Sequence, residues 1–279
     1  MSKKLTTIIL IILAFLMIYP LLITVTNSFM KDKEVMSNYS LIGNENAEEF
    51  LSFKLIPENF SLYQHYQVLI AKSKYLRMFW NTCFIVLPLV IGHVIVSSMA
   101  AFAFSKLKFK FKNGLFFLYI SIMMMPFQVT LVPNYLVLDK LRLIDNYLSI
   151  ILPGIFGTFG VFLLKQFMDA IPNEYIEAAR TEGCSTLQIF YKVVLPLSKE
   201  GIAALTILSF IDNWNMVEQP LIFLKDVNSR PLSLYLSNIN TTSLGIAFAA
   251  GVIYMIPMFL VFLYGEKYLI EGIKHSGIK

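Results

Sequence analysis

Long runs without a charged side chain divide this sequence and limit what it can fold into. Residues 5–30, 113–138 and 231–265 contain no Asp, Glu, Lys or Arg. A helix of about 20 apolar residues is long enough to cross a bilayer. Soluble domains carry about 25% charged residues, whereas this chain carries 15%. The sequence therefore predicts an all-α membrane protein and excludes a soluble enzyme, a disordered chain and a secreted disulfide scaffold.

Six segments fit helices that cross the membrane. Both chain ends then lie on the same side of it. The third segment contains Met123-Met124-Met125-Pro126, which predicts a kink. The predicted spans are 5–30, 78–105, 113–138, 146–164, about 201–224 and about 244–265.

The basic side chains orient these spans. Lys106, Lys108, Lys110 and Lys112 crowd one short loop, whereas the next short loop contains Lys140 and Arg142. Cytoplasmic loops are richer in lysine and arginine, so the N-terminus and the C-terminus are both expected inside. The net charge of +5 is then a sign of topology and not of nucleic-acid binding. The lysines of 106–112 are expected to anchor the cytoplasmic face, with a lipid headgroup or a partner subunit as alternative contacts.

This orientation predicts three parts of the chain. The first transmembrane helix lies in 1–30, and an extracytoplasmic loop follows in 31–77. Residues 78–279 form a core of five helices, which includes a long cytoplasmic loop at 166–200.

The loop 166–200 has its own local structure signals. Pro172 suits the first turn of a helix, and Gly183 suits a helix end. Ser185 followed three residues later by Gln188 predicts a capping box, and Pro196 precedes the fifth span. The sequence therefore predicts a helix over about 172–182, a tight turn and a second short helix.

This loop also carries a motif. Glu177-Ala178-Ala179, Gly183 and Val193-x-Leu195-Pro196 resemble the "EAA…G…I-x-LP" loop of permease subunits of binding-protein-dependent ABC importers. Val193 stands where that pattern usually has Ile. Further stretches resemble the carbohydrate branch of this family, related to the second maltose permease subunit. They are 56–60, 79–82, 125–133, 162–167, 214–215 with 220–221, 230–232 and 268–272.

The resemblance implies an ATP-driven importer of a sugar or oligosaccharide in the cytoplasmic membrane of a prokaryote. Its expected partners are a second homologous permease, two ATP-binding subunits and an extracytoplasmic solute-binding protein. The ATP and magnesium would be bound by the ATPase subunits, so this chain is expected to hold no cofactor, metal or catalytic residue. No phosphate-loop pattern G-x-x-x-x-G-K-[ST] occurs in the sequence. We therefore do not expect it to be an enzyme alone.

In such importers the EAA helix docks into a cleft of an ATPase subunit. The resemblance implies that Glu177 is a polar anchor, that Ala178 and Ala179 allow close approach, and that Gly183 permits the turn. A C-terminal tail with Ser276 and Gly277 is also expected to reach the ATPases. The full set expected to couple to the ATPases is Glu177, Ala178, Ala179, Glu182, Gly183, Leu195 and Pro196.

A polar cluster interrupts the fifth span. Charged groups at membrane depth are costly and normally face a cavity or a partner. Carboxylates and amides bind sugar hydroxyls, and an aromatic face packs on a sugar ring, so the cluster is a candidate substrate path. A polar kink, a subunit contact and a proton relay remain alternatives. The residues are Asp212, Asn213, Trp214, Asn215, Glu218 and Gln219.

Other polar or small residues within the spans are expected to serve helix packing. His93 is expected to be a hydrogen-bonded packing residue. Gly154, Gly157 and Gly160 recur every three residues, which favours close helix packing.

Two other functions remain open from the sequence. An importer of the same build could carry a glycerol phosphate ester, although the central spans lack inward lysines or arginines. An ion-coupled secondary transporter would need a carboxylate relay, for which Asp212 and Glu218 are the candidates.

Overall fold

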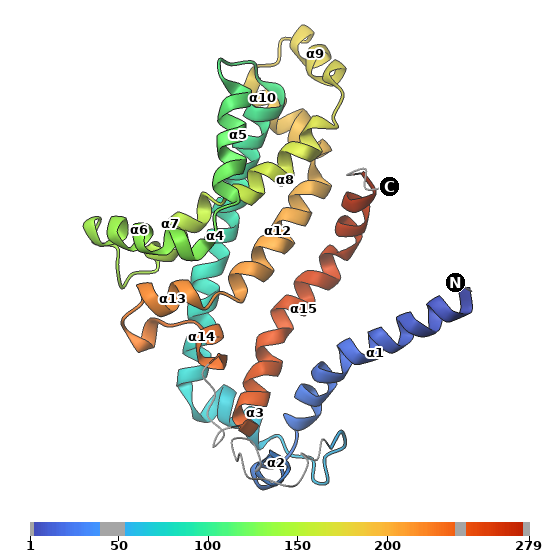
Figure 1. Cartoon of the computed structure of the whole chain (residues 1–279), viewed down its shortest axis with the longest axis vertical. Coiled ribbons are helices and arrows are strands. Elements are labelled where there is room, and N and C mark those ends of the chain that lie inside the picture. The colour runs from blue at the N-terminus through green and yellow to red at the C-terminus, as the bar shows by residue number, and fades with distance from the viewer. Residues whose placement is uncertain (1–2, 40–53, 238–243, 276–279) are drawn as a thin grey trace. The chain divides into compact units, whose positions relative to one another are not determined.

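The computed structural model describes residues 3–39, 54–237 and 244–275, and the side chains of 4–39, 54–237 and 244–268 (Figure 1). The regular elements among these residues are helical. They fall into two compact units. The first comprises residues 1–80 and 231–257, and the second comprises 81–230 and 258–279.

The first unit begins with a long apolar helix and continues with short ones. Over its most apolar stretch α1 buries none of its residues inside the chain, as expected for a helix that faces lipid. After α1, Met30, Val35 and Tyr39 form a small core against Leu244 and Phe248. The elements of this unit are α1 (Lys3–Asn27), α2 (Asp32–Tyr39), α3 (Tyr63–Tyr66), the π-helical turn η1 (Gln67–Ala71), the start of α4 (Ser73–Lys106), α14 (Leu232–Leu236) and the first part of α15 (Leu244–His275).

The second unit holds most of the helices. Besides the remainders of α4 and α15, its elements are α5 (Lys112–Met123), α6 (Phe127–Lys140), α7 (Leu148–Ile155), α8 (Thr158–Asp169), α9 (Asn173–Thr181), α10 (Thr186–Ile189), the π-helical turn η2 (Phe190–Val194), α11 (Leu195–Leu197), α12 (Lys199–Trp214), α13 (Glu218–Phe223) and the 3₁₀ turn η3 (Val227–Ser229).

The described residues contain four helices long and apolar enough to cross a membrane, or up to six if each of two bent pairs counts as one span. The predicted six spans therefore need both bent pairs. The four are Lys4–Asn27, Ser73–Lys106, Leu148–Asp169 (α7 and α8 counted together) and Leu244–Tyr268. The two bent pairs are Lys112–Met123 with Phe127–Lys140, and Thr186–Leu197 with Lys199–Trp214.

The predicted third span is broken at the expected place. Helix α5 ends at Met123 and α6 starts at Phe127, with a bend of 100° between them. With 12 residues, α5 is about 18 Å long at 1.5 Å per residue, which is too short to cross a core of about 30 Å alone. The residue before a proline disfavours helical geometry, so Met125-Pro126 accounts for the break.

The predicted fifth span ends early. Helix α12 stops at Trp214, and the separate short helix α13 begins at Glu218. The polar cluster therefore lies on the last turn of α12, on the link that follows and on the first turn of α13, instead of on one continuous helix over 201–224.

The predicted close packing of the fourth span is confirmed. A Cβ added to Gly160 would lie 2.4 Å from Ser97 Oγ, and one added to Gly157 would lie 2.9 Å from His93 Nε2. Both partners are on α4, so α8 and the residues before it can approach α4 only where side chains are absent. Gly154 meets Leu89 in the same way, at 2.5 Å.

A buried apolar cluster joins the α9 region to the spans of the second unit. It combines residues near the end of α4 with residues of α8, the α8–α9 link, α9, α10, η2 and α12. Its buried members are Ala101, Phe102, Val161, Leu164, Met168, Ile171, Ile176, Ala179, Ile189, Phe190, Val194 and Leu205.

Candidate functional site

The segment that carries the EAA motif forms a helix, a left-handed turn and a second helical stretch. Helix α9 ends at Thr181, and Gly183 has φ +82°. The Cys184 N–H donates to the Ala179 carbonyl at 3.0 Å, and the Gly183 N–H donates to the Arg180 carbonyl at 3.0 Å. This pair of bonds is the Schellman arrangement, in which glycine is favoured because a Cβ is strained at positive φ. The expected glycine turn is confirmed.

The second helical stretch starts with the predicted capping box. The Gln188 N–H donates to Ser185 Oγ at 3.3 Å, and the Ser185 N–H donates to Gln188 Oε1 at 2.7 Å. The turn at Gly183 and this cap together fix the angle between α9 and α10.

The two alanines of the motif face different ways. Ala179 is buried with Ile176 in the core of the second unit, whereas Ala178 and Glu177 are exposed. Residues three apart share a helix face, so Ile176 and Ala179 hold α9 against its own chain. Of Glu177, Ala178 and Ala179, the first two are therefore available to a partner.

The remaining predicted coupling residues are also placed. Glu182 and Gly183 are exposed at the end of α9. Leu195 packs against the buried cluster, and Pro196 is exposed in the first turn of α11. Ser276 and Gly277 lie outside the described residues.

Large apolar side chains are also exposed on α9, α10 and η2. Tyr175, Leu187 and Tyr191 are 55%, 65% and 61% exposed, respectively. Apolar side chains grouped on a surface mark contact sites for other proteins or for lipid. This segment thus combines a small exposed alanine, Ala178, with large exposed apolar side chains.

The end of α4 is fastened to the start of α9. Lys106 Nζ donates to the Ile171 carbonyl at 2.6 Å and to Asn173 Oδ1 at 3.2 Å. The adjacent Ser105 Oγ donates to Asp169 Oδ1, at the end of α8, at 2.6 Å. The α8–α9 connection is therefore held on both sides by the last turn of α4. The sequence signalled Lys106 only as part of a basic loop, because its partners are distant in the chain.

A cavity of about 710 Å³ lies within the second unit; it is called the polar cavity below, for the polar side chains within its largely apolar lining. It is lined by residues of α4 to α8, α12 and α13, and by the link between the last two. Its polar lining combines a carboxylate, amides, hydroxyls and an imidazole: His93, Thr130, Asn134, Ser149, Thr158, Ser209, Asp212, Asn213 and Gln219.

The predicted substrate-path residues divide between this cavity and other surroundings. Asp212, Asn213 and Gln219 line the cavity. Trp214 is 1% exposed and stacks on Phe210 with ring centroids 5.0 Å apart. Its indole face is therefore occupied by the chain itself and does not offer a surface to a sugar ring in this conformation.

The other two members, Asn215 and Glu218, bond to other groups of the chain. Asn215 donates to the Ile211 carbonyl at 2.8 Å. Glu218 accepts bonds from Gln128 Nε2 at 3.2 and 3.4 Å, which links α13 to α6. These two side chains are not among the lining residues of the cavity.

His93 is hydrogen-bonded, as expected, and it also belongs to the cavity wall. Its Nδ1 lies 2.9 Å from Ser209 Oγ, and its Nε2 lies 3.2 Å from the Gly157 carbonyl oxygen. Asn134, Thr130 and Thr158 also line the cavity, and no motif in the sequence points to them. The available signal was a polar side chain inside an otherwise apolar run.

The apolar helices and the loop that carries the EAA motif together are those of a membrane-spanning transport subunit. Residues 93–274 match the family described as the binding-protein-dependent transport system inner membrane component, and the chain belongs to that family. It is thus a permease subunit of an ABC importer, which is not an enzyme on its own and depends on partner subunits. The family assignment also decides against the ion-coupled secondary transporter considered from the sequence.

Two kinds of relative show how far this similarity extends. The chain is 29% identical over 270 residues to the arabinooligosaccharides transport system permease protein AraQ of Halalkalibacterium halodurans, across 96% of this chain and 93% of the relative. It is 31% identical over 204 residues to the sn-glycerol-3-phosphate transport system permease protein UgpE of Pectobacterium atrosepticum, across 71% and 73%.

A solved structure shares the fold. A chain from the crystal structure of a bacterial ABC transporter involved in the import of the acidic polysaccharide alginate matches with a TM-score of 0.80 and 23% identity, over 96% of this chain and 98% of that chain. The predicted all-α permease fold is confirmed.

Proposed function

We propose that this permease subunit imports a sugar or oligosaccharide and that Asp212, Asn213 and Gln219 line part of its path. The observation that carries this proposal is the cavity of about 710 Å³, whose polar lining is made of amides, hydroxyls, an imidazole and one carboxylate. Such groups match the hydroxyl-rich surface of a sugar, while the apolar remainder of the lining suits the faces of its rings. The relative named for arabinooligosaccharides supports the same class of substrate.

A glycerol phosphate ester is the second candidate, because a relative named for that substrate is 31% identical. A phosphate would favour basic partners. Among the described residues, the cavity lining includes Asp212 but neither lysine nor arginine. The charge of the lining therefore favours the sugar.

We place this chain in a complex in the cytoplasmic membrane of a prokaryote, with both ends inside. The partners are a second homologous permease, two ATP-binding subunits and an extracytoplasmic binding protein. Residues 1–30 hold the first span, 31–77 the outer loop, and 78–279 the core. In this arrangement α9 and the turn at Gly183 would dock on an ATPase, with Glu177 and Ala178 at the contact.

Uptake into proteoliposomes that hold the complete complex tests the path. Asp212→Asn and Gln219→Ala should raise the substrate concentration needed for half-maximal uptake of an arabino-oligosaccharide. Asn215→Ala is the control, because Asn215 lies in the same polar stretch but not in the cavity lining. Unchanged uptake in both cavity variants would remove these residues from the path. Preferred uptake of glycerol 3-phosphate by the wild-type complex would overturn the substrate class.

A further inference from the structure

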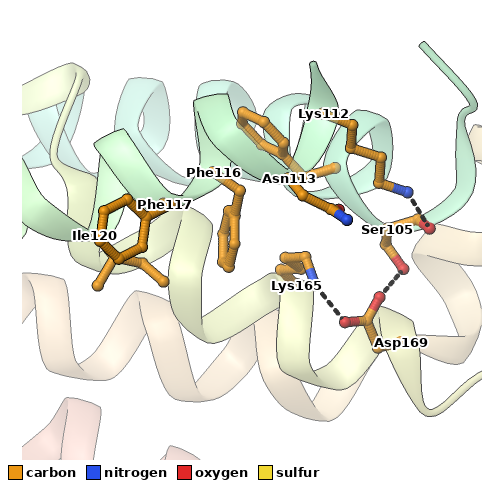
Figure 2. A pocket seen from close by; sticks show the side chains of 9 residues that line it. Ser105, Lys112, Asn113, Phe116, Phe117, Ile120, Lys165 and Asp169 are labelled. Carbon is orange, nitrogen blue, oxygen red and sulfur yellow. Dashed lines mark hydrogen bonds and ion pairs between the residues drawn. The ribbon is translucent and has the colours of Figure 1, made fainter. Parts of the chain in front are cut away.

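A second pocket, of about 320 Å³, lies between α5, the end of α4 and α8 (Figure 2). One part of its wall is polar, with Ser105, Lys112, Asn113, Lys165 and Asp169. The other part is apolar, with Phe104, Phe116, Phe117 and Ile120. Figure 2 shows the lysine ends and Asn113 on one side and Phe117 with Ile120 on the other. The pocket is therefore amphipathic.

The two lysines of the polar part retain donors for a ligand. Lys165 Nζ bonds Asp169 Oδ2 at 2.5 Å, and Lys112 Nζ bonds the carbonyls of Ser105 and Leu107 at 3.0 Å each. An ammonium group has three donors, so these bonds leave at least one on each lysine. Asp169 is itself satisfied by Ser105 and Lys165, which reduces its repulsion of an anion.

The position of these lysines along the chain places the pocket at the membrane surface. Lys112 directly precedes the charge-free residues 113–138, and Lys165 directly follows the charge-free residues 146–164. Lysines at the ends of apolar helices lie at the level of the lipid headgroups. The apolar part of the pocket then extends toward the acyl chains, and Phe117 is 72% exposed there.

The surrounding lysines favour a ligand with a negative charge. Lys108 and Lys110 are exposed on the loop that leads into α5, next to Lys112. Basic pockets between transmembrane helices on the cytoplasmic side bind anionic lipid headgroups. A cationic or neutral ligand would leave this charge unmatched.

We propose that this pocket binds an anionic phospholipid, with the phosphate between Lys112, Asn113 and Lys165 and an acyl chain along Phe116, Phe117 and Ile120. Asn113 supplies a neutral amide to the phosphate, and Lys165 is further placed by its ring contact, with Nζ 4.6 Å from the centre of Phe116. The site is separate from the polar cavity and does not depend on the identity of the imported solute.

Native mass spectrometry of the full chain, delipidated and then titrated with lipid, tests this proposal. Phosphatidylglycerol should bind more tightly than phosphatidylcholine with the same acyl chains. Lys112→Gln and Lys165→Gln should each weaken phosphatidylglycerol binding about fivefold, and Asn113→Asp should weaken it as well because it adds a negative charge. Lys192→Gln is the matched control, since Lys192 is exposed on η2 and outside the pocket.

The same measurements contain the results that would overturn the site. Equal binding of the two lipids, or wild-type binding by all three pocket variants, would do so. Displacement of phosphatidylglycerol by an equal concentration of inorganic phosphate would show that the apolar wall contributes nothing to binding. Spectra in which chain dimers exclude lipid would assign the pocket to a second copy of the chain. Asn113 is exposed, so Asn113→Asp keeps the test valid if a lysine variant fails to fold.

Discussion

Lys106 Nζ lies 2.6 Å from the carbonyl oxygen of Ile171, so the last residue of α4 holds the backbone that leads into α9. The Asn173 side chain completes this contact at 3.2 Å. A charge-assisted hydrogen bond contributes about 1.5–3 kcal/mol. We therefore expect a displacement of α9 to be transmitted to the end of α4 through the two bonds of Lys106.

Lys106→Met should loosen this connection. We expect the complex to assemble and to hydrolyse ATP, but to transport fewer solute molecules per ATP, because the polar link between α4 and α9 is lost and only the apolar cluster still joins them. Lys108→Met is the control, since Lys108 is exposed two residues further on. The ratio of uptake to phosphate release in proteoliposomes measures the effect. An unchanged ratio in Lys106→Met would show that this contact does not transmit motion.

Substitution of the two motif alanines by leucine should have different effects, on ATPase binding for Ala178 and on folding for Ala179. Ala178→Leu adds bulk on the exposed face of α9, so the chain should fold and insert but recover less ATPase on co-purification. Ala179→Leu adds bulk inside the cluster that contains Ile176. Overpacking costs about 1–3 kcal/mol, so this variant should lower the amount of folded chain. Membrane levels and co-purified ATPase, measured together, separate the two. Full ATPase recovery by Ala178→Leu would place the docking contact elsewhere.

Local signals predicted the α9 region well because capping depends on neighbours in sequence. Gly183, and Ser185 with Gln188, act within a few residues. Long-range partners could not be predicted in this way. Nothing near Lys106 in sequence indicates Ile171, and nothing near His93 indicates Ser209. Trp214 shows the same limit, because a polar stretch in sequence does not reveal that its ring faces Phe210.

Substitution of Gly183 tests the cost of left-handed backbone geometry without a steric clash. A Cβ built there has no atom within 4 Å, so Gly183→Ala meets no steric clash. The remaining cost is left-handed backbone geometry at φ +82°, about 1–2 kcal/mol for a residue with a Cβ. Gly183→Asn should lose less stability than Gly183→Ala, because asparagine tolerates this backbone geometry better. Thermal unfolding should rank glycine above asparagine above alanine. A stability for Gly183→Ala equal to that of the wild type would contradict this explanation.

His65, in α3 of the first unit, predicts a dependence on pH. Its ring stacks on Phe29 at 4.8 Å, and within the described residues its buried Nδ1 has no hydrogen-bond partner. Burial lowers the pKa of His65 below its ordinary value of 6.5. The unfolded chain then binds more protons, so the contribution to stability is complete above pH 6.5 and decreases as the pH falls through the lowered pKa.

The measurement is thermal unfolding of the wild type and of His65→Gln between pH 8 and pH 5. Glutamine does not titrate, so the wild type should lose more stability than the variant across this interval. Parallel losses in the two proteins would show that other groups cause the acid sensitivity.

Gly160 tests the close approach of α8 to α4. A Cβ there would lie 2.4 Å from Ser97 Oγ and 2.5 Å from His93 Nε2. Because His93 also holds Ser209 and the Gly157 carbonyl, it cannot move without breaking bonds. Gly160→Ala should therefore destabilise the chain by about 1–3 kcal/mol. Gly114→Ala is the matched control, because nothing lies within 4 Å of a Cβ at that helical glycine, and alanine there should be neutral or stabilising by up to about 1 kcal/mol. Unfolding of both variants in detergent compares them, and equal stabilities would mean that α4 and α8 separate more easily than this packing implies.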